Sequence, residues 1–185
     1  MRVFRVNPWR PAAAVLRQAA ASLRRGGVVV YPTDTAYALG GIFNRASVAR
    51  RVLAIKGRRD PKFTLIASSL AQVERSFRLS SAARAIARRF WPGPLSLVVS
   101  PKFAVRVPAN RVARELARLA GAPLIATSAN RSGGGTPYTA GAAARQLRGG
   151  RRQPDLMLNA GRLPKRKPST IVRVDGRGGW RVIRP

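Results

Sequence analysis

The feature that most limits how this chain can fold is a regular alternation of short apolar runs with segments of helical periodicity. The first residues have the pattern of a short strand, and apolar residues then recur at helical spacing over residues 11–25, before Gly26 and Gly27. Residues 28–32, which read VVVYP, form a β-branched run typical of a buried strand. Strands that alternate with helices are joined by crossover connections, so the pattern predicts a largely parallel sheet covered by helices.

The same alternation continues to the C-terminus. Later apolar runs predict strands at residues 63–67, 95–100, 104–108, 123–127, 169–174 and 180–185. Helices are predicted at residues 47–55, 82–90, 113–120 and 140–150, with N-caps at Ser47, at Ser80 or Ser81, and at Thr139. Several connections are too short for a helix, so we expect a mixed sheet. The prediction is therefore one α/β domain, residues 1–185, with a twisted mixed sheet and helices.

The charge of the chain favours anionic partners. It has 36 Lys and Arg residues against 6 Asp and Glu, which gives a formal net charge of +30. A domain this basic concentrates anions around itself, and nucleic acid is the commonest biological polyanion. A compositional bias toward arginine explains the same numbers, and both interpretations stay open at this point.

Missing residue types exclude several kinds of chemistry. The chain has no Cys and no His, which excludes disulfides, thiolate nucleophiles, Cys/His zinc sites and a histidine general base. No run of about 20 apolar residues exists, so we expect no membrane span. The arginine-rich, acid-free N-terminus has some features of a transit peptide, but its strand and helix patterns favour folded structure. We therefore expect a cytoplasmic protein.

Polar side chains gather in four segments next to predicted strands and helices, at residues 33–35, 56–59, 127–136 and 165–170. Ligands of open α/β sheets bind in the loops beyond the carboxyl ends of strands. Each segment also has an ordinary explanation: a turn, cations at a helix C-terminus, a flexible loop, and a charged strand entry. No common nucleotide signature is present.

Together the four segments contain the parts of an anion and nucleotide site. Lys56 and Arg58 diverge on a regular helix, but a frayed helix end can turn both toward one phosphate chain. Ser128 and Asn130, also two residues apart, point the same way on an extended segment. The glycines at 133–135 allow backbone N–H groups to approach an anion closely.

Six motifs in register resemble those of the YrdC/YciO family: YPTDTAYALGG, KGR, FWPGPLSLVV, VRVP, ATSANRSG and PSTIV. The resemblance extends from about Gly26 to the C-terminal IRP. It implies a YrdC-like twisted α/β sheet around a deep, positively charged cavity. It also implies a threonylcarbamoyl-AMP synthase, a nucleotidyltransferase that forms threonylcarbamoyl-adenylate and pyrophosphate from L-threonine, bicarbonate and ATP. That product serves the threonylcarbamoyladenosine modification of tRNA.

The resemblance also implies roles for individual residues. Thr33, Arg106 and Ser169 would contact L-threonine, and Asp34 would hold the turn or attract the substrate ammonium. The residues that would contact ATP are Lys56, Arg58, Ser128, Asn130, Thr136 and Arg184, of which Lys56 and Arg58 would be catalytic. Mg²⁺ would be carried by the ATP phosphates, without a protein metal ligand. The implied macromolecular partner is tRNA or double-stranded RNA.

Some positions depart from the synthase pattern. YALGG and FTLIA are more similar to the YciO branch, Ser96 stands where many members have threonine, and the KGRRDPKF loop is about one residue short. The intact KxR and SxN motifs favour the synthase branch. A YciO-like RNA- or nucleotide-binding protein without synthase activity is the alternative, and another carbamoyl- or adenylyl-transfer reaction on the same fold is a third possibility.

Overall fold

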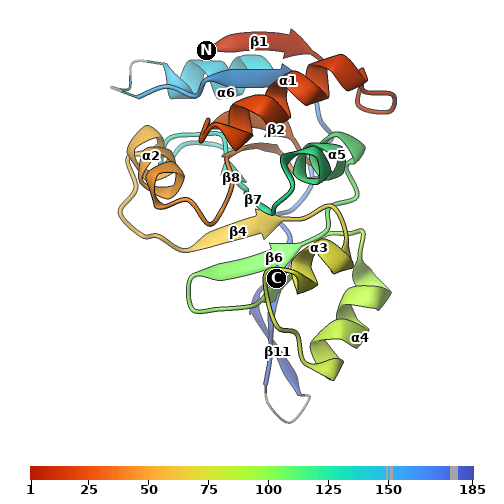
Figure 1. Ribbon diagram of the computed structural model, residues 1–185. Coiled ribbons are helices and arrows are strands. Elements are labelled where there is room, and N and C mark those ends of the chain that lie inside the picture. The colour runs from red at the N-terminus through yellow and green to blue at the C-terminus, as the bar shows by residue number, and fades with distance from the viewer. Residues whose placement is uncertain (149, 151, 176–178) are drawn as a thin grey trace.

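The computed structural model describes residues 1–148, 150, 152–175 and 179–185, which form two mixed β-sheets and six α-helices (Figure 1). The five-stranded sheet has the order β1 (Arg2–Arg5), β9 (Leu156–Asn159), β2 (Val29–Pro32), β3 (Tyr37–Gly40) and β8 (Thr127–Ser128). The six-stranded sheet has the order β11 (Trp180–Arg184), β10 (Thr170–Val174), β5 (Leu95–Val98), β6 (Phe103–Arg106), β4 (Phe63–Ile66) and β7 (Leu124–Ile125).

Helices cover both faces of the five-stranded sheet. In helix α1 (Ala13–Arg24), Leu16, Ala19, Ala20 and Leu23 repeat at helical spacing and form one buried stripe. This stripe packs with helix α5 (Arg111–Ala120) against Val29 and Tyr31 of β2. Helices α2 (Ala46–Lys56) and α6 (Ala140–Leu147) pack on the opposite face, where the alternate residues Val28 and Val30 point. This burial on both faces explains the continuous apolar run at residues 28–32.

The six-stranded sheet lies in the lower half of Figure 1, with helices α3 (Leu70–Glu74) and α4 (Ser81–Phe90) beside it. Ala83 and Ala87 of α4 pack against Leu97 and Val172 on strands β5 and β10. Strand β11 forms an edge of this sheet and is exposed along its whole length. The pairs β4–β6 and β5–β10 are parallel, and the remaining pairs of this sheet are antiparallel.

Most predicted elements are confirmed within one to three residues, and two of the predicted N-caps are confirmed. Ser80 Oγ accepts a hydrogen bond from Ala83 N, and Thr139 Oγ1 accepts one from Ala142 N. The cap at Ser47 is wrong, because α2 begins at Ala46 and Arg45 occupies the N-cap position without a side-chain bond. Helix α6 ends at Leu147, short of the predicted residue 150, and residues 149 and 151 lie outside the described part of the chain.

The predicted mixed sheet is present as two sheets rather than one, and the predicted strand at 123–127 is divided. The segment 123–127 contains two short strands, β7 in the six-stranded sheet and β8 in the five-stranded sheet. The chain passes from one sheet to the other at Ala126, whose N–H donates to Thr64 O of β4. Elements β3, α3 and β9 were not among the predicted ones.

Close backbone packing holds the two sheets together at this crossover. A Cβ atom on Gly40 would lie 1.7 Å from Ile125 O, so only glycine fits at the end of β3. The Tyr31 hydroxyl donates to the same Ile125 O at 2.6 Å, and the burial of Tyr31 raises its pKa despite the charge of Arg106. The crossover thereby places Thr127 and Ser128 at the junction of the two sheets.

Candidate functional site

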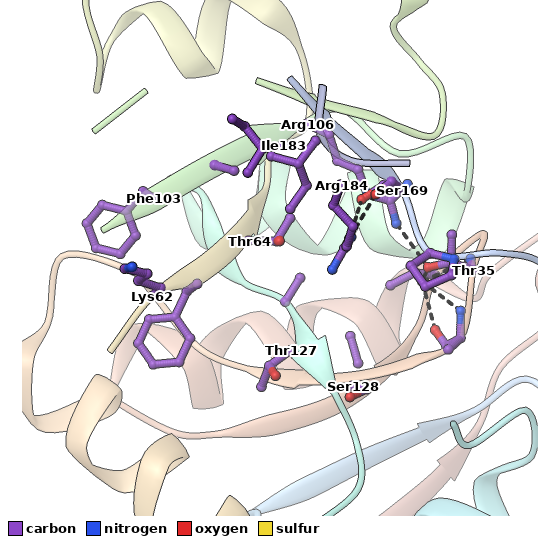
Figure 2. Close-up of a pocket in the computed structure, with 18 of the residues that line it drawn as sticks. Thr35, Lys62, Thr64, Phe103, Arg106, Thr127, Ser128, Ser169, Ile183 and Arg184 are labelled. Atoms are coloured by element: carbon purple, nitrogen blue, oxygen red, sulfur yellow. Dashed lines mark hydrogen bonds between the residues drawn. The ribbon is translucent and has the colours of Figure 1, made fainter. Parts of the chain in front are cut away.

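Residues of both sheets line one cavity of about 510 Å³ (Figure 2). Its volume lies in the range of small-molecule sites. The basic residues in its lining are Arg58, Lys62, Lys102, Arg106, Arg166, Arg173 and Arg184. None of the residues described in the lining is Asp or Glu. This lining has the composition that a positively charged cavity requires.

The turn between β2 and β3 forms one wall of the cavity. Thr33 Oγ1 accepts hydrogen bonds from the backbone N–H groups of Thr35 and Ala36, each at 3.2 Å, and donates to Ala36 O at 2.7 Å. The ordinary explanation for residues 33–35, a turn, is therefore confirmed, and the bonds of Thr33 Oγ1 make it an ST turn. Both Thr33 and Thr35 line the cavity, so the turn also faces the cavity.

Arg106, at the end of β6, reaches across to this turn. Its Nη1 lies 2.7 and 2.8 Å from the two carboxylate oxygens of Asp34, and its Nη2 donates to Thr35 Oγ1 at 3.2 Å. The side chains of Arg106 and Asp34 are only 4% and 6% exposed. Asp34 also accepts from Ala109 N at 3.2 Å. This ion pair ties the five-stranded sheet to the six-stranded sheet beside the cavity.

Two buried serines lie next to the C-terminal strand. Ser96 Oγ and Ser169 Oγ share a hydrogen bond of 2.9 Å, and both residues are buried. Arg184 of β11 donates from Nη2 to Ser169 O at 2.8 Å. Burial, and then the nearby charge of Arg106, lowers the pKa of Arg184. Figure 2 shows Ser169, Arg184 and Thr35 grouped on one side of the cavity.

Lys56, the last residue of α2, hydrogen-bonds to β8 and to the loop that follows it. Its Nζ donates to Ser128 O at 2.7 Å and to Asn130 O and Oδ1 at 2.9 Å. Three acceptors match the three N–H bonds of an ammonium group. Burial, together with the charge of Arg58, lowers the pKa of Lys56 to about 8. Asn130 Oδ1 also accepts from Ser128 Oγ at 2.6 Å, so Lys56 orients both residues of the SxN motif.

Arg58 lines the cavity whereas Lys56 does not, and Gly57 stands between them with a φ of 64°. This left-handed residue ends α2 and turns the following chain toward the cavity. Arg58 Nε donates to Asp60 O at 2.8 Å, its Nη2 donates to Lys62 O, and its guanidinium lies 5.0 Å from the centroid of the Phe63 ring. The predicted frayed helix end is therefore a left-handed C-cap, and it separates the two cations.

Seven of the nine predicted site residues line the cavity: Thr33, Arg58, Arg106, Ser128, Thr136, Ser169 and Arg184. Lys56 and Asn130 do not line it, because their polar atoms bond to each other and to the loop. The predicted roles of all nine residues in ATP or threonine binding remain predictions.

Sequence reasoning missed several lining residues. Arg166 lies in the polar segment 165–170 and Lys62 lies three residues beyond the segment 56–59, so their sequence position was the available signal. Phe63 and Phe103 stand opposite each other on the parallel strands β4 and β6. Phe63 belongs to the predicted strand at 63–67, and Phe103 directly precedes the predicted strand at 104–108. Figure 2 shows Lys62 and Phe103 at the end of the cavity opposite Thr35.

No helix in the described ranges is long and apolar enough to cross a membrane. Within those ranges, no three acidic, His or Cys side chains form a cluster that could hold a metal ion. The acidic side chain beside the cavity, Asp34, is bound to Arg106.

Known proteins resemble this chain in sequence and in fold. A family profile described as "Telomere recombination", Sua5/YciO/YrdC, matches residues 21–185. The chain is 38% identical to the threonylcarbamoyl-AMP synthase of Thiobacillus denitrificans over 168 residues, which cover 82% of this chain and 87% of that protein.

Two solved structures have closely similar folds. Sua5 of Pyrococcus abyssi, crystallised with L-threonine, superposes with a TM-score of 0.85 at 30% identity, over 94% of this chain and 54% of that one. YciO of E. coli superposes with a TM-score of 0.83 at 26% identity, over 100% of this chain and 95% of that one. The predicted family and α/β fold are confirmed: the chain belongs to the Sua5/YciO/YrdC family.

Proposed function

We propose that this protein is a threonylcarbamoyl-AMP synthase that uses L-threonine, bicarbonate and ATP. The observation that carries the proposal is the convergence of seven predicted site residues, from segments between Thr33 and Arg184, on one cavity. Its relative in Thiobacillus denitrificans bears this name, and the similar Sua5 structure holds L-threonine. The proposed cellular role is the supply of the activated threonylcarbamoyl group for tRNA modification in the cytoplasm.

The two ends of the cavity suit different substrates. The end with Thr33, Arg106 and Ser169 offers hydroxyls and the guanidinium of Arg106, which match the polar groups and the carboxylate of an amino acid. The other end carries Arg58, Lys62 and Phe63, which suit a polyphosphate and a base. We therefore propose that threonine binds at the turn and ATP along the loops after α2 and β8.

The chemistry needs no covalent nucleophile from the protein. The amine of threonine attacks the carbon of bicarbonate, a carbamate forms with loss of water, and a carbamate oxygen then attacks the α-phosphate of ATP while pyrophosphate leaves. The chain has no His or Cys, and its cavity offers cations and hydroxyls. The proposed contribution of the protein is therefore positioning and neutralisation of phosphate charge.

A magnesium ion fits this cavity only if the ATP phosphates supply most of its ligands. Mg²⁺ prefers oxygen ligands, and the described lining offers the hydroxyls of Thr33, Thr35, Ser128 and Thr136 but no free carboxylate. When bound with ATP, it would supply further neutralisation of phosphate charge.

The experiment that tests the proposal measures pyrophosphate release from ATP while L-threonine or bicarbonate is omitted in turn, with L-serine as a competitor. We expect release only when both substrates are present. Arg58→Ala should lower this release about 10- to 100-fold, because it removes a charged contact to phosphate. The matched control is Arg59→Ala, an exposed neighbour outside the cavity lining. Pyrophosphate release that does not depend on L-threonine would contradict the proposal.

The exposed C-terminal hairpin favours RNA binding as a second candidate function. Trp180 is 61% exposed, and Arg173 and Arg181 stand directly opposite each other on β10 and β11. Like charges in this position repel unless an anion lies between them. An exposed aromatic ring beside arginines also suits stacking against a nucleotide base. A tRNA or double-stranded RNA would then bind at the rim of the cavity, where Arg173 also lies.

A filter-binding assay with tRNA tests this second function. Binding should fall steeply between 50 and 200 mM salt, by roughly 10³-fold if about six phosphates are contacted. It should also weaken when Arg181 is replaced by Glu. RNA binding without threonine-dependent pyrophosphate release would favour the YciO-like alternative.

A further inference from the structure

Asp34 has a place in the cavity wall that the proposed reaction does not yet use. It lies at the turn between β2 and β3, and its side chain is almost completely buried against Arg106. We propose that Asp34 is a positioning residue, whose carboxylate holds the Arg106 guanidinium in the orientation that receives the carboxylate of the amino-acid substrate. This inference rests on the proposed function of the same site.

The contacts leave one edge of the guanidinium available. Both oxygens of Asp34 approach a single nitrogen, Nη1, and the weaker contact to Gly93 O at 3.4 Å uses Nη1 as well. Within the described part of the chain, the other bond to Arg106 joins Nη2 to Thr35 Oγ1. A guanidinium binds a carboxylate best with two neighbouring N–H groups. The edge formed by Nε and Nη2 therefore remains for a second carboxylate, which fits an amino acid in the cavity.

Asp34 has an anchor of its own and does not depend on Arg106 for its position. The N–H of Ala109, from the segment after β6, donates to Asp34 Oδ2 at 3.2 Å. The turn that carries Asp34 is fixed by the hydroxyl of Thr33. Asp34 is thus positioned by the Ala109 N–H and by its own turn, and it in turn pairs with Arg106. Asp34 Oδ1 has no hydrogen-bond partner among the described residues, but it lies 2.7 Å from Arg106 Nη1, so Arg106 already balances the charge of this carboxylate.

A second interpretation of the Asp34–Arg106 pair predicts that loss of Asp34 changes threonine binding in the opposite direction. If Asp34 merely occupied the place of the substrate carboxylate, the substrate would have to displace it, and removal of Asp34 would tighten binding. If Asp34 positions Arg106, removal lets the long arginine side chain adopt other rotamers, and binding of the substrate weakens. The two interpretations predict changes in opposite directions.

The experiment compares Asp34→Ala and Asp34→Asn with the wild-type protein. L-Threonine binding is measured by calorimetry, and KM for L-threonine and for ATP by pyrophosphate release. L-Threoninamide, which lacks the carboxylate, is tested beside L-threonine. We expect Asp34→Ala to weaken L-threonine binding about 10- to 100-fold, the range for a hydrogen bond to a charged group. KM for ATP should stay within about twofold, and the preference for threonine over threoninamide should be largely lost, since both depend on the same local contact.

The chain offers a matched control in Asp155→Ala. Asp155 forms another carboxylate–guanidinium pair, with Arg51 at 2.7 Å, outside the cavity lining. This variant should leave both KM values unchanged. If Asp34→Ala fails to fold, Asp34→Asn retains the size and one acceptor oxygen and should show the same loss in smaller degree.

The outcomes separate this inference from the proposed function. Weaker threonine binding in the Asp34 variants supports the inference even if the wild-type protein releases no pyrophosphate, in which case only the proposed function fails. Unchanged or tighter threonine binding in Asp34→Ala overturns the inference while wild-type turnover upholds the function. Absence of threonine binding to the wild-type protein overturns both.

Discussion

The two ends of the cavity differ in how their side chains are held. At the turn end, Thr33, Arg106 and Ser169 are buried, and each bonds to a residue far away in the sequence or to the turn itself. At the loop end, residues 59–62 and 131–136 are exposed, and Arg58 bonds within its own loop. A preorganised site loses less conformational entropy when a ligand binds. The comparison indicates a rigid site for a small substrate beside loops that a larger nucleotide would order.

The comparison predicts its largest effect at Arg106, which belongs to the rigid end. Arg106→Ala leaves the buried carboxylate of Asp34 without a counter-ion, so the free energy of unfolding should fall by about 3–5 kcal/mol. Threonine-dependent turnover should fall at least about 100-fold, because the proposed carboxylate contact is lost with it. Urea unfolding and pyrophosphate release measure the two effects.

The control for this prediction is Arg84→Ala. Arg84 pairs with Glu74 at 2.6 Å, but both side chains are about a third or more exposed. An exposed pair of this kind contributes about 0–1 kcal/mol. Equal stability of the Arg84 and Arg106 variants would contradict the view that the turn end is rigidly braced.

A smaller effect is expected at Lys56, which lies outside the cavity lining and supports the loop end. Lys56→Met removes a donor from Ser128 O, Asn130 O and Asn130 Oδ1. Ser128 O keeps the N–H of Asn130 and Asn130 Oδ1 keeps the Ser128 hydroxyl, so the free energy of unfolding should fall by about 1–3 kcal/mol, the cost of one buried acceptor without a partner. KM for ATP should rise at least about tenfold, while L-threonine binding should stay close to that of the wild type. Exposed Lys165→Met serves as the control. A comparable loss of threonine binding would show that the two ends are not independent.

The smallest effect is expected from pH. Above about pH 8, Lys56 in the folded protein loses a proton and keeps two N–H donors for three acceptors. We expect kcat/KM for ATP to decline between pH 8 and 10, and this decline should disappear in Lys56→Met.

The stability contribution of Lys56 should change in the opposite direction over the same window. Its folded pKa, about 8, lies below the ordinary value of 10.5. Between these values the unfolded chain binds more protons than the folded protein, so this residue makes the free energy of unfolding rise with pH. Activity and this part of the stability would therefore diverge, which separates a loop effect from unfolding.

Local patterns were enough to predict most elements, whereas the resemblance to the family named the residues that gather at the site. The apolar run at 28–32 and the caps at Ser80 and Thr139 depend on neighbouring residues and were correctly predicted. The crossing of the chain between two sheets at Ala126 was not predictable, because residues 123–127 read as one apolar run. The close approach of Gly40 to Ile125 beside this crossing is a tertiary contact.

The family motifs placed seven of nine site residues in one cavity, but they did not reveal how those residues are held. The acceptors of Lys56 include two backbone oxygens, and the residue types in a sequence do not predict which backbone oxygens a side chain will bond to. Asp34 and Arg106 lie 72 residues apart and meet only because the two sheets pack together. Side-chain identity was therefore readable from the sequence, whereas the contacts that orient the side chains required the fold.

The most direct measurement of the central claim is mass spectrometry of the product formed from ATP, L-threonine and ¹³C-bicarbonate. The account predicts threonylcarbamoyl-adenylate that carries one ¹³C atom, formed together with pyrophosphate and lost when Arg106 is replaced by Ala. Threonyl-adenylate without the label, or no threonine-containing adenylate from folded protein, would contradict it.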